Sequence, residues 1–119
     1  METHLFFIGL ALIMTHELDA IRRREWRMFP LTFWLPERWG YLVFTAVHTP
    51  LFALLFLNLY GTDGINRGLV RGLDIFFIVH VVLHLLFLTH PKNEFRSAFS
   101  WVLIGGAGLS GAIDLIVSF

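Results

Sequence analysis

The chain has 119 residues, of which 56% are hydrophobic and only 15% are charged, and its mean hydropathy is +0.70. A soluble domain carries about 25% charged residues, so this composition disfavours a soluble enzyme, a disordered chain and a nucleic-acid-binding arm. The formal net charge of zero gives no bulk attraction to polyanions, and the absence of cysteine excludes disulfides, thiol catalysis and Cys-ligated zinc.

Four apolar segments are long enough to cross a bilayer. About 20 helical residues cover a hydrocarbon core of about 30 Å, and a helix satisfies its own backbone polar groups there. These segments fall at about residues 4–21, 40–60, 69–90 and 97–119. The predicted fold class is therefore all-α, an integral membrane four-helix up-down bundle that forms a single transmembrane domain over residues 1–119.

The distribution of Lys and Arg predicts the orientation of these helices. The first and third loops carry seven basic residues between them, whereas the second loop region carries two. The seven are Arg22, Arg23, Arg24, Arg27, Arg38, Lys92 and Arg96, and the two are Arg67 and Arg71. Because basic loops stay in the cytoplasm, we expect both termini to lie outside.

The segment 97–119 is rich in small residues, which let helix backbones approach closely in lipid. These residues are Gly105, Gly106, Ala107, Gly108, Ser110, Gly111 and Ala112. They predict either close packing inside the bundle or the contact surface of a homodimer.

Histidines recur at a matching depth in the first three segments. Measured from the arginine-rich side, His16, His48, His80 and His84 lie about 7 to 15 Å deep. His80 and His84 are four residues apart, so they project from one face of a helix and can chelate one small ion. Ionisable groups within membrane spans are costly and usually face the bundle interior.

Neutral imidazoles together with carboxylates suit transition metals such as zinc, iron, copper and nickel. We therefore predict a site for one divalent transition metal, zinc or iron, formed by His48, His80 and His84. Either His16 or Glu17 would complete it. A polar core of hydrogen-bonded histidines is the alternative.

Carboxylates divide into two groups by depth. Glu17 and Asp19 lie beside His16, and they are the predicted catalytic residues, because a spare carboxylate can carry a proton for a metal-activated water. Asp19 could instead accept a hydrogen bond from a ligand imidazole. Asp74 and Asp114 lie in the outer half of the membrane, where a structural role is expected.

The run Thr15-His16-Glu17-Leu18-Asp19-Ala20, followed by Glu25-Trp26-Arg27, resembles small uncharacterised membrane proteins of bacteria. It is similar to the domain-of-unknown-function family 6713 and, more loosely, to the HXXEE-type membrane family. In the latter a first-helix His precedes paired acids, a pattern that His16 to Asp19 does not reproduce. The resemblance implies a four-helix protein of the bacterial inner membrane and no established reaction.

Four functions fit these patterns. The first is a metal-dependent membrane hydrolase that acts on a lipid-like substrate, with the metal activating a water. The alternatives are a b-type haem protein, a proton or metal carrier, and a structural subunit of a larger membrane complex. Membrane lipids are the expected partners, a homodimer through the fourth helix is possible, and no nucleic-acid partner is expected.

Overall fold

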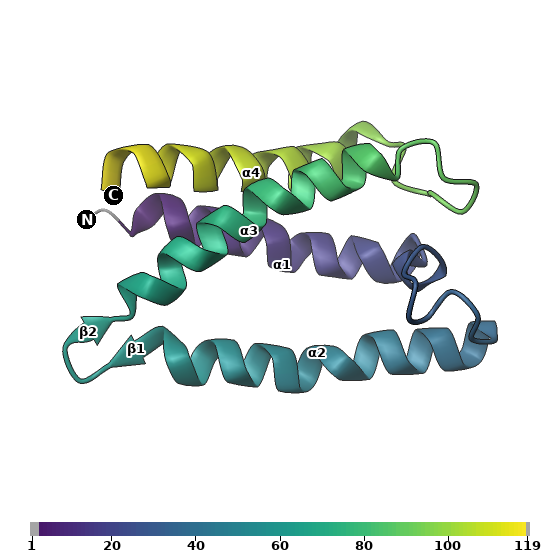
Figure 1. Cartoon of the computed structure of the whole chain (residues 1–119), viewed down its shortest axis with the longest axis horizontal. Helices are drawn as coiled ribbons and strands as arrows, with labels where there is room; N and C mark the ends of the chain where they lie inside the picture. The colour runs from purple at the N-terminus through teal and green to yellow at the C-terminus, as the bar shows by residue number, and fades with distance from the viewer. Residues whose placement is uncertain (1–2, 119) are drawn as a thin grey trace.

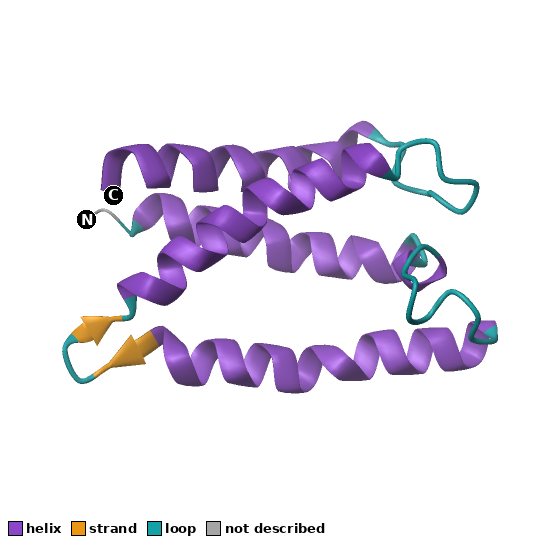
Figure 2. Cartoon of the chain, in the orientation of Figure 1, coloured by secondary structure: helices purple, strands orange, loops and turns teal. Residues whose placement is uncertain are grey.

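The computed structural model describes residues 3–118, and in them four long α-helices account for most of the chain (Figure 2). They are α1 (His4–Arg22), α2 (Glu37–Leu59), α3 (Arg67–Leu86) and α4 (Ala98–Ser118). Each is long and apolar enough to span a membrane. The predicted all-α class with four membrane-spanning helices is therefore confirmed.

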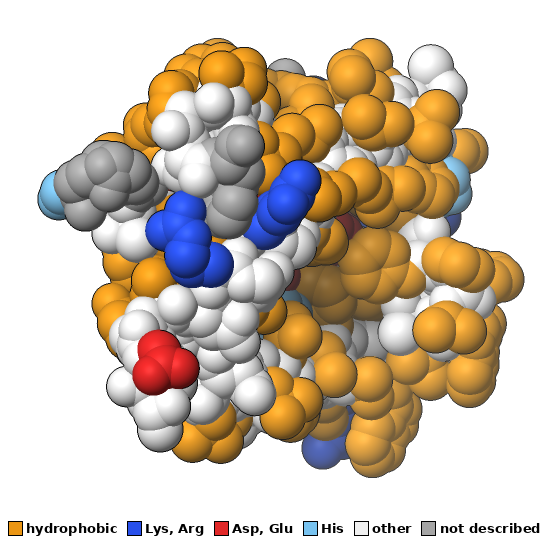
Figure 3. Space-filling model, turned by 60° about the vertical axis from the view of Figure 1, so that its left-hand side comes forward, with side chains coloured by type: hydrophobic (Ala, Val, Ile, Leu, Met, Phe, Trp, Pro, Cys, Tyr) orange, Lys and Arg blue, Asp and Glu red, His pale blue; other side chains and the backbone are white. Residues whose placement is uncertain are grey.

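The helices run up and down, with both termini at one end of the molecule and the first and third loops at the other (Figure 1). α4 packs along both α1 and α3. α2 lies apart from this group of three, and its buried residues are few: Gly40, Phe44 and Leu59. Hydrophobic side chains cover much of the face shown in Figure 3.

Short elements complete the chain between the helices. A 3-10 helix, η1, covers Glu25–Arg27 in the first loop. The second loop is a hairpin of two-residue strands, β1 (Tyr60–Gly61) and β2 (Gly64–Ile65), which pair antiparallel. Asn66 then caps α3, because its side-chain oxygen accepts a hydrogen bond from the backbone N–H of Leu69 at 3.1 Å.

Two helix ends differ by three or more residues from the sequence-based bounds. α2 begins at Glu37, directly after Pro36, so its first turn is polar and precedes the apolar run. α3 ends at Leu86 and does not continue to residue 90. There the side chain of Asn93 donates to the carbonyl of Leu88 at 3.1 Å, which satisfies a backbone group outside the helix.

Two apolar clusters fill the interior, one toward the hairpin end and one toward the loops. The first contains Phe6, Leu10, Ile13, Leu59, Val70, Phe77 and Ala107. The second contains Ala20, Trp26, Met28, Phe44, Phe95 and Ile104. Along α1, His16 lies between Ile13 of the first cluster and Ala20 of the second, so its imidazole sits in an otherwise apolar interior.

The small residues of α4 allow it to approach α3 closely. A Cβ added at Gly111 would lie 2.7 Å from the backbone oxygen of Asp74, and one added at Gly108 would overlap the side chain of Val81. Asp74 and Asp114 are fully buried beside this contact, and their carboxyl groups interact with each other. The glycines thus set the distance between the two helices.

This close approach predicts that Gly111→Ala destabilises the protein, because the added methyl group meets backbone that cannot move aside. Overpacking of this kind costs about 1 to 3 kcal/mol. Gly105→Ala is the matched control, since none of the described residues lies within 4 Å of a Cβ at that position. Thermal unfolding in detergent measures both variants. Equal melting temperatures for the two would contradict the close approach of α3 and α4.

Candidate metal centre

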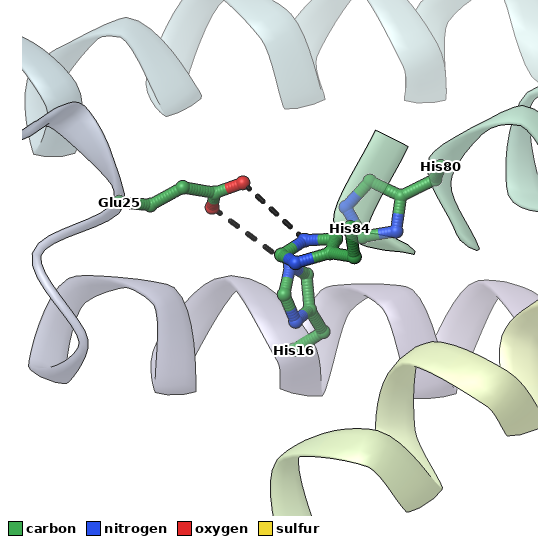
Figure 4. A group of neighbouring side chains, drawn as sticks. All are labelled: His16, Glu25, His80 and His84. Carbon is green, nitrogen blue, oxygen red and sulfur yellow. Dashed lines mark ion pairs between the residues drawn. The ribbon is translucent and has the colours of Figure 1, made fainter. Parts of the chain in front are cut away.

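Three imidazoles from two helices meet inside the bundle. His16 comes from α1, and His80 and His84 come from one face of α3 (Figure 4). The ring centroids lie 4.6 Å apart for His16–His80, 5.0 Å for His16–His84 and 4.6 Å for His80–His84. All three residues are buried, and His16 has an exposed fraction of 0%. The predicted shared face of His80 and His84 therefore points at His16.

A carboxylate from the first loop completes the group. Glu25 is buried, with one oxygen 3.8 Å from His16 Nε2 and the other 3.6 Å from His84 Nε2 (Figure 4). Glu25 reaches this position because the backbone of Arg24 adopts a left-handed conformation, with φ of 54°. Such a conformation in a residue other than glycine costs about 1 kcal/mol or more and persists where the surroundings hold it.

Packing behind Glu25 fixes the turn that carries it. Trp26 is buried against α2, and a Cβ added at Gly40 would overlap its indole ring. Thr32 donates a hydrogen bond to the Trp26 carbonyl at 2.7 Å. On the other side, the ring of Phe95 covers His84 at a centroid distance of 4.6 Å. The carboxylate and the imidazoles are thus held from several directions.

The dimensions of this group suit a metal ion. One ligand atom from each of His16, Glu25, His80 and His84 can be chosen so that all lie within 4.8 Å of one another. In a tetrahedral zinc site, ligand atoms that are each about 2.1 Å from the ion lie about 3.4 Å from one another. The most widely separated ligand atoms therefore need to approach by up to about 1.4 Å to share one ion.

Several nitrogens in the group lack a hydrogen-bond partner. Among the described residues, neither Nδ1 nor Nε2 of His16 has one, and nor does Nδ1 of His80. A buried polar atom without a partner costs about 1 to 3 kcal/mol. An ion shared by the group would give one nitrogen of each imidazole a partner, which the hydrogen bonds within the group do not.

His48 was predicted to join His80 and His84, but it contacts Glu17 and the backbone of its own helix instead. Its Nε2 lies 2.5 Å from Glu17 Oε2, and its Nδ1 lies 2.6 Å from the carbonyl oxygen of Phe44. Because that carbonyl can only accept, Nδ1 must carry a hydrogen. A single proton is then shared between His48 Nε2 and Glu17. The other oxygen of Glu17 lies 4.0 Å from His16 Nε2, so this pair borders the three-histidine group.

Asp19 has separate partners that join α1 to α4. Ser100 donates to one of its oxygens at 2.5 Å, and Arg23 donates to the other at 3.2 Å. Arg23 in turn donates to Ser97 at 3.3 Å. The structure therefore brings together three of the four predicted histidines, pairs the fourth with Glu17, and places Asp19 in a helix-to-helix contact.

Sequence analysis did not assign Glu25 to the site. It lies in a run of arginines outside the apolar segments, and no helical periodicity links it to a histidine. The sequence feature that could have pointed to Glu25 was its place as an acid within this basic loop. It also lies next to Trp26, an aromatic residue able to anchor the segment. Only the left-handed turn at Arg24 directs the carboxylate inward.

A cavity of about 360 Å³ adjoins the group between α2 and α3. Five titratable residues contribute to its wall, and the rest of its lining is almost entirely apolar. The titratable residues are Glu17, Glu25, His48, His80 and His84. The candidate metal centre is therefore open to a ligand on one side.

The contacts of Asp19 predict that Asp19→Asn lowers stability while leaving metal content unchanged. It removes the charge that Arg23 and Ser100 bond, and a hydrogen bond to a charged group contributes about 1.5 to 3 kcal/mol. Unfolding in detergent and elemental analysis measure the two effects, with Asp63→Asn in the exposed hairpin as control. A folded Asp19→Asn protein that has lost its metal would place Asp19 in the site after all.

Comparisons with known proteins agree with the likeness seen in the first-helix motif. No curated protein and no solved structure matches the chain. The model of one family of unknown function matches residues 2–119, which is nearly the whole chain, and the looser likeness to the HXXEE-type family stays an expectation. The chain therefore belongs to that family of unknown function, DUF6713.

Proposed function

We propose that this protein is a membrane metalloprotein that holds one divalent transition metal, zinc or iron, through His16, His80, His84 and Glu25. The observation that carries the proposal is the convergence of three buried imidazoles and one buried carboxylate on a common point. Charged and polar groups inside a membrane span are costly and mark functional sites. Nitrogen and oxygen ligands in this ratio suit zinc and iron.

The small separation of the rings favours an ion over haem. A haem needs its axial histidines on opposite sides of a macrocycle, whereas these three rings touch, with centroids 4.6 to 5.0 Å apart. No macrocycle fits between rings at this distance. A single small ion is compatible with the same geometry.

The reaction that the site supports best is hydrolysis of a lipid-like substrate. A divalent ion held by these residues would lower the pKa of a water and polarise a carbonyl group. Glu17, which borders the cavity, would accept the proton of the attacking water. The hydroxyl would add to the carbonyl carbon of an ester as the bond to the leaving oxygen breaks, and Glu17 would return the proton to that oxygen.

His48 supports Glu17 in this scheme. The contact between His48 Nε2 and Glu17 lies at the edge of the cavity, next to the three-histidine group. The carbonyl of Phe44 fixes the hydrogen on Nδ1, so His48 Nε2 is oriented toward the carboxylate. His48 is thus a positioning residue for the base rather than a metal ligand.

Metal analysis of histidine variants tests the ligand set. We expect His16→Ala and His84→Ala to lose most of the bound zinc or iron, because each removes one of the converging nitrogens. His48→Ala should keep it, and the interfacial His90→Ala serves as a second control. Acidification should release the ion, since protonated imidazoles cannot bind it. Retention of metal by both His16→Ala and His84→Ala would refute the site.

Substitutions of Glu25 and Glu17 distinguish metal ligation from proton transfer. Glu25→Gln should weaken metal binding by at least about tenfold, the lower end of what loss of a neighbouring metal-site group usually costs. Glu17→Gln should keep the metal and abolish turnover of an ester-linked lipid, because an amide cannot accept the proton. Metal loss in Glu17→Gln with full binding in Glu25→Gln would exchange the two assignments.

We further propose that the protein lies in the bacterial inner membrane with both termini outside. The arginine-rich loops at the end opposite the termini support this orientation (Figure 1). The chain has no cysteine, so single cysteines report topology without background. A membrane-impermeant maleimide should label Asp63→Cys in intact cells and Lys92→Cys only after permeabilisation. The opposite pattern would invert the orientation.

A further inference from the structure

We propose that the cavity between α2 and α3 binds one hydrocarbon chain of a membrane lipid, which enters sideways from the bilayer. This inference rests on the proposed function, because it names the substrate class of the same site. It commits to a lipid that has an ester or comparable polar linkage at the end of that chain.

The wall away from the histidines offers only apolar contact to an occupant. α2 contributes Val43, Val47 and Leu51, one turn apart along the helix, and α3 contributes Phe76 and Leu83. A hydrocarbon chain gains about 0.8 kcal/mol for each methylene that it removes from water. A polar, water-soluble substrate would find no hydrogen-bond partner along these residues.

The opening of the cavity faces the lipid. Val43, Val47, Leu51 and Leu83 line the cavity and are each about half exposed, Val47 with an exposed fraction of 52%. In a membrane-spanning helix such surface is covered by lipid chains. α2 packs loosely against α1 and α3, so the cavity is continuous with the bilayer between α2 and α3.

The volume limits the occupant to a single chain. Sites for small molecules usually measure about 300 to 1,000 Å³, and this cavity of about 360 Å³ is at the lower end. A two-chain lipid must therefore leave its second chain in the bilayer. The lateral opening makes that arrangement possible.

The polar groups fix the direction of the chain. Glu25, His80 and His84 lie on the wall of the cavity, and Met28 marks its end toward the loops. A second cavity adjoins at Met28 and is lined by Arg27, Glu37, His90 and Lys92 among others. A lipid can thus place its headgroup toward the loops and its linkage beside the metal centre.

Photo-crosslinking in lipid nanodiscs tests this placement. The probe is a phospholipid with a diazirine on one acyl chain, added to phosphatidylcholine nanodiscs that contain the full chain, and crosslinks are mapped by mass spectrometry. Every lipid-facing residue will be labelled to some extent, so the measured quantity is enrichment. We expect lining residues such as Val43 and Leu83 to be labelled roughly tenfold more than outward residues such as Leu54, a ratio that corresponds to about 1.4 kcal/mol.

Matched variants make the result specific to the cavity. Val47→Trp fills it and should remove the enrichment, whereas Val82→Trp should preserve it. Val82 is also about half exposed, at 48%, but it does not line the cavity. Leu83→Trp is a second cavity-filling variant in case Val47→Trp does not fold. Even labelling of lining and outward residues, or enrichment that survives both filling variants, would overturn the inference.

Elemental analysis of the same samples separates this inference from the proposed function. Enrichment in a protein that binds no metal would support the lipid site and refute the metal centre. Bound metal without enrichment would support the metal centre and refute the lipid site. It would point to a substrate that approaches from water.

Discussion

The unsolvated imidazole of His16 imposes the central constraint on this structure. It lies on α1 between two apolar clusters, with an exposed fraction of 0%, so bulk water does not reach its nitrogens. The groups around it are His80 and His84 from α3 and Glu25 from the first loop. Any arrangement that keeps these groups buried must bring α1, α3 and that loop together, and it must supply partners for the remaining polar atoms.

The rest of the bundle divides into a rigid part and an open part around this point. Small residues on α4 let it contact the backbone of α3, and the Asp19–Ser100 hydrogen bond links it to α1. α2 is joined to α1 by the His48–Glu17 contact but packs only loosely against α1 and α3, and it leaves the cavity beside the histidines. A site on rigid elements with one open side is the arrangement that combines fixed ligands with access for a substrate.

The first loop connects the membrane interface to the interior. Arg24 and Arg27 form ion pairs with Glu37 at the start of α2, at 3.5 and 2.6 Å. Between these two arginines the chain turns, and Glu25 points inward while Trp26 packs on α2. The basic residues that favour a cytoplasmic loop thus also help to hold the turn that carries the carboxylate.

The sequence by itself determined the four helices, because apolar length and backbone hydrogen bonding leave no other structure in a bilayer. It also predicted that His16, His48, His80 and His84 lie at a similar depth and that His80 and His84 share a face, since depth and the i, i+4 spacing depend only on helix geometry. Helix geometry alone did not determine how α2 is rotated about its own axis. In the tertiary structure this rotation directs His48 toward Glu17. The inward position of Glu25 depended on one left-handed residue in an irregular loop, where no periodic pattern exists. Packing determined both the rotation of α2 and the inward position of Glu25, because the local sequence is compatible with several helix rotations and several loop turns.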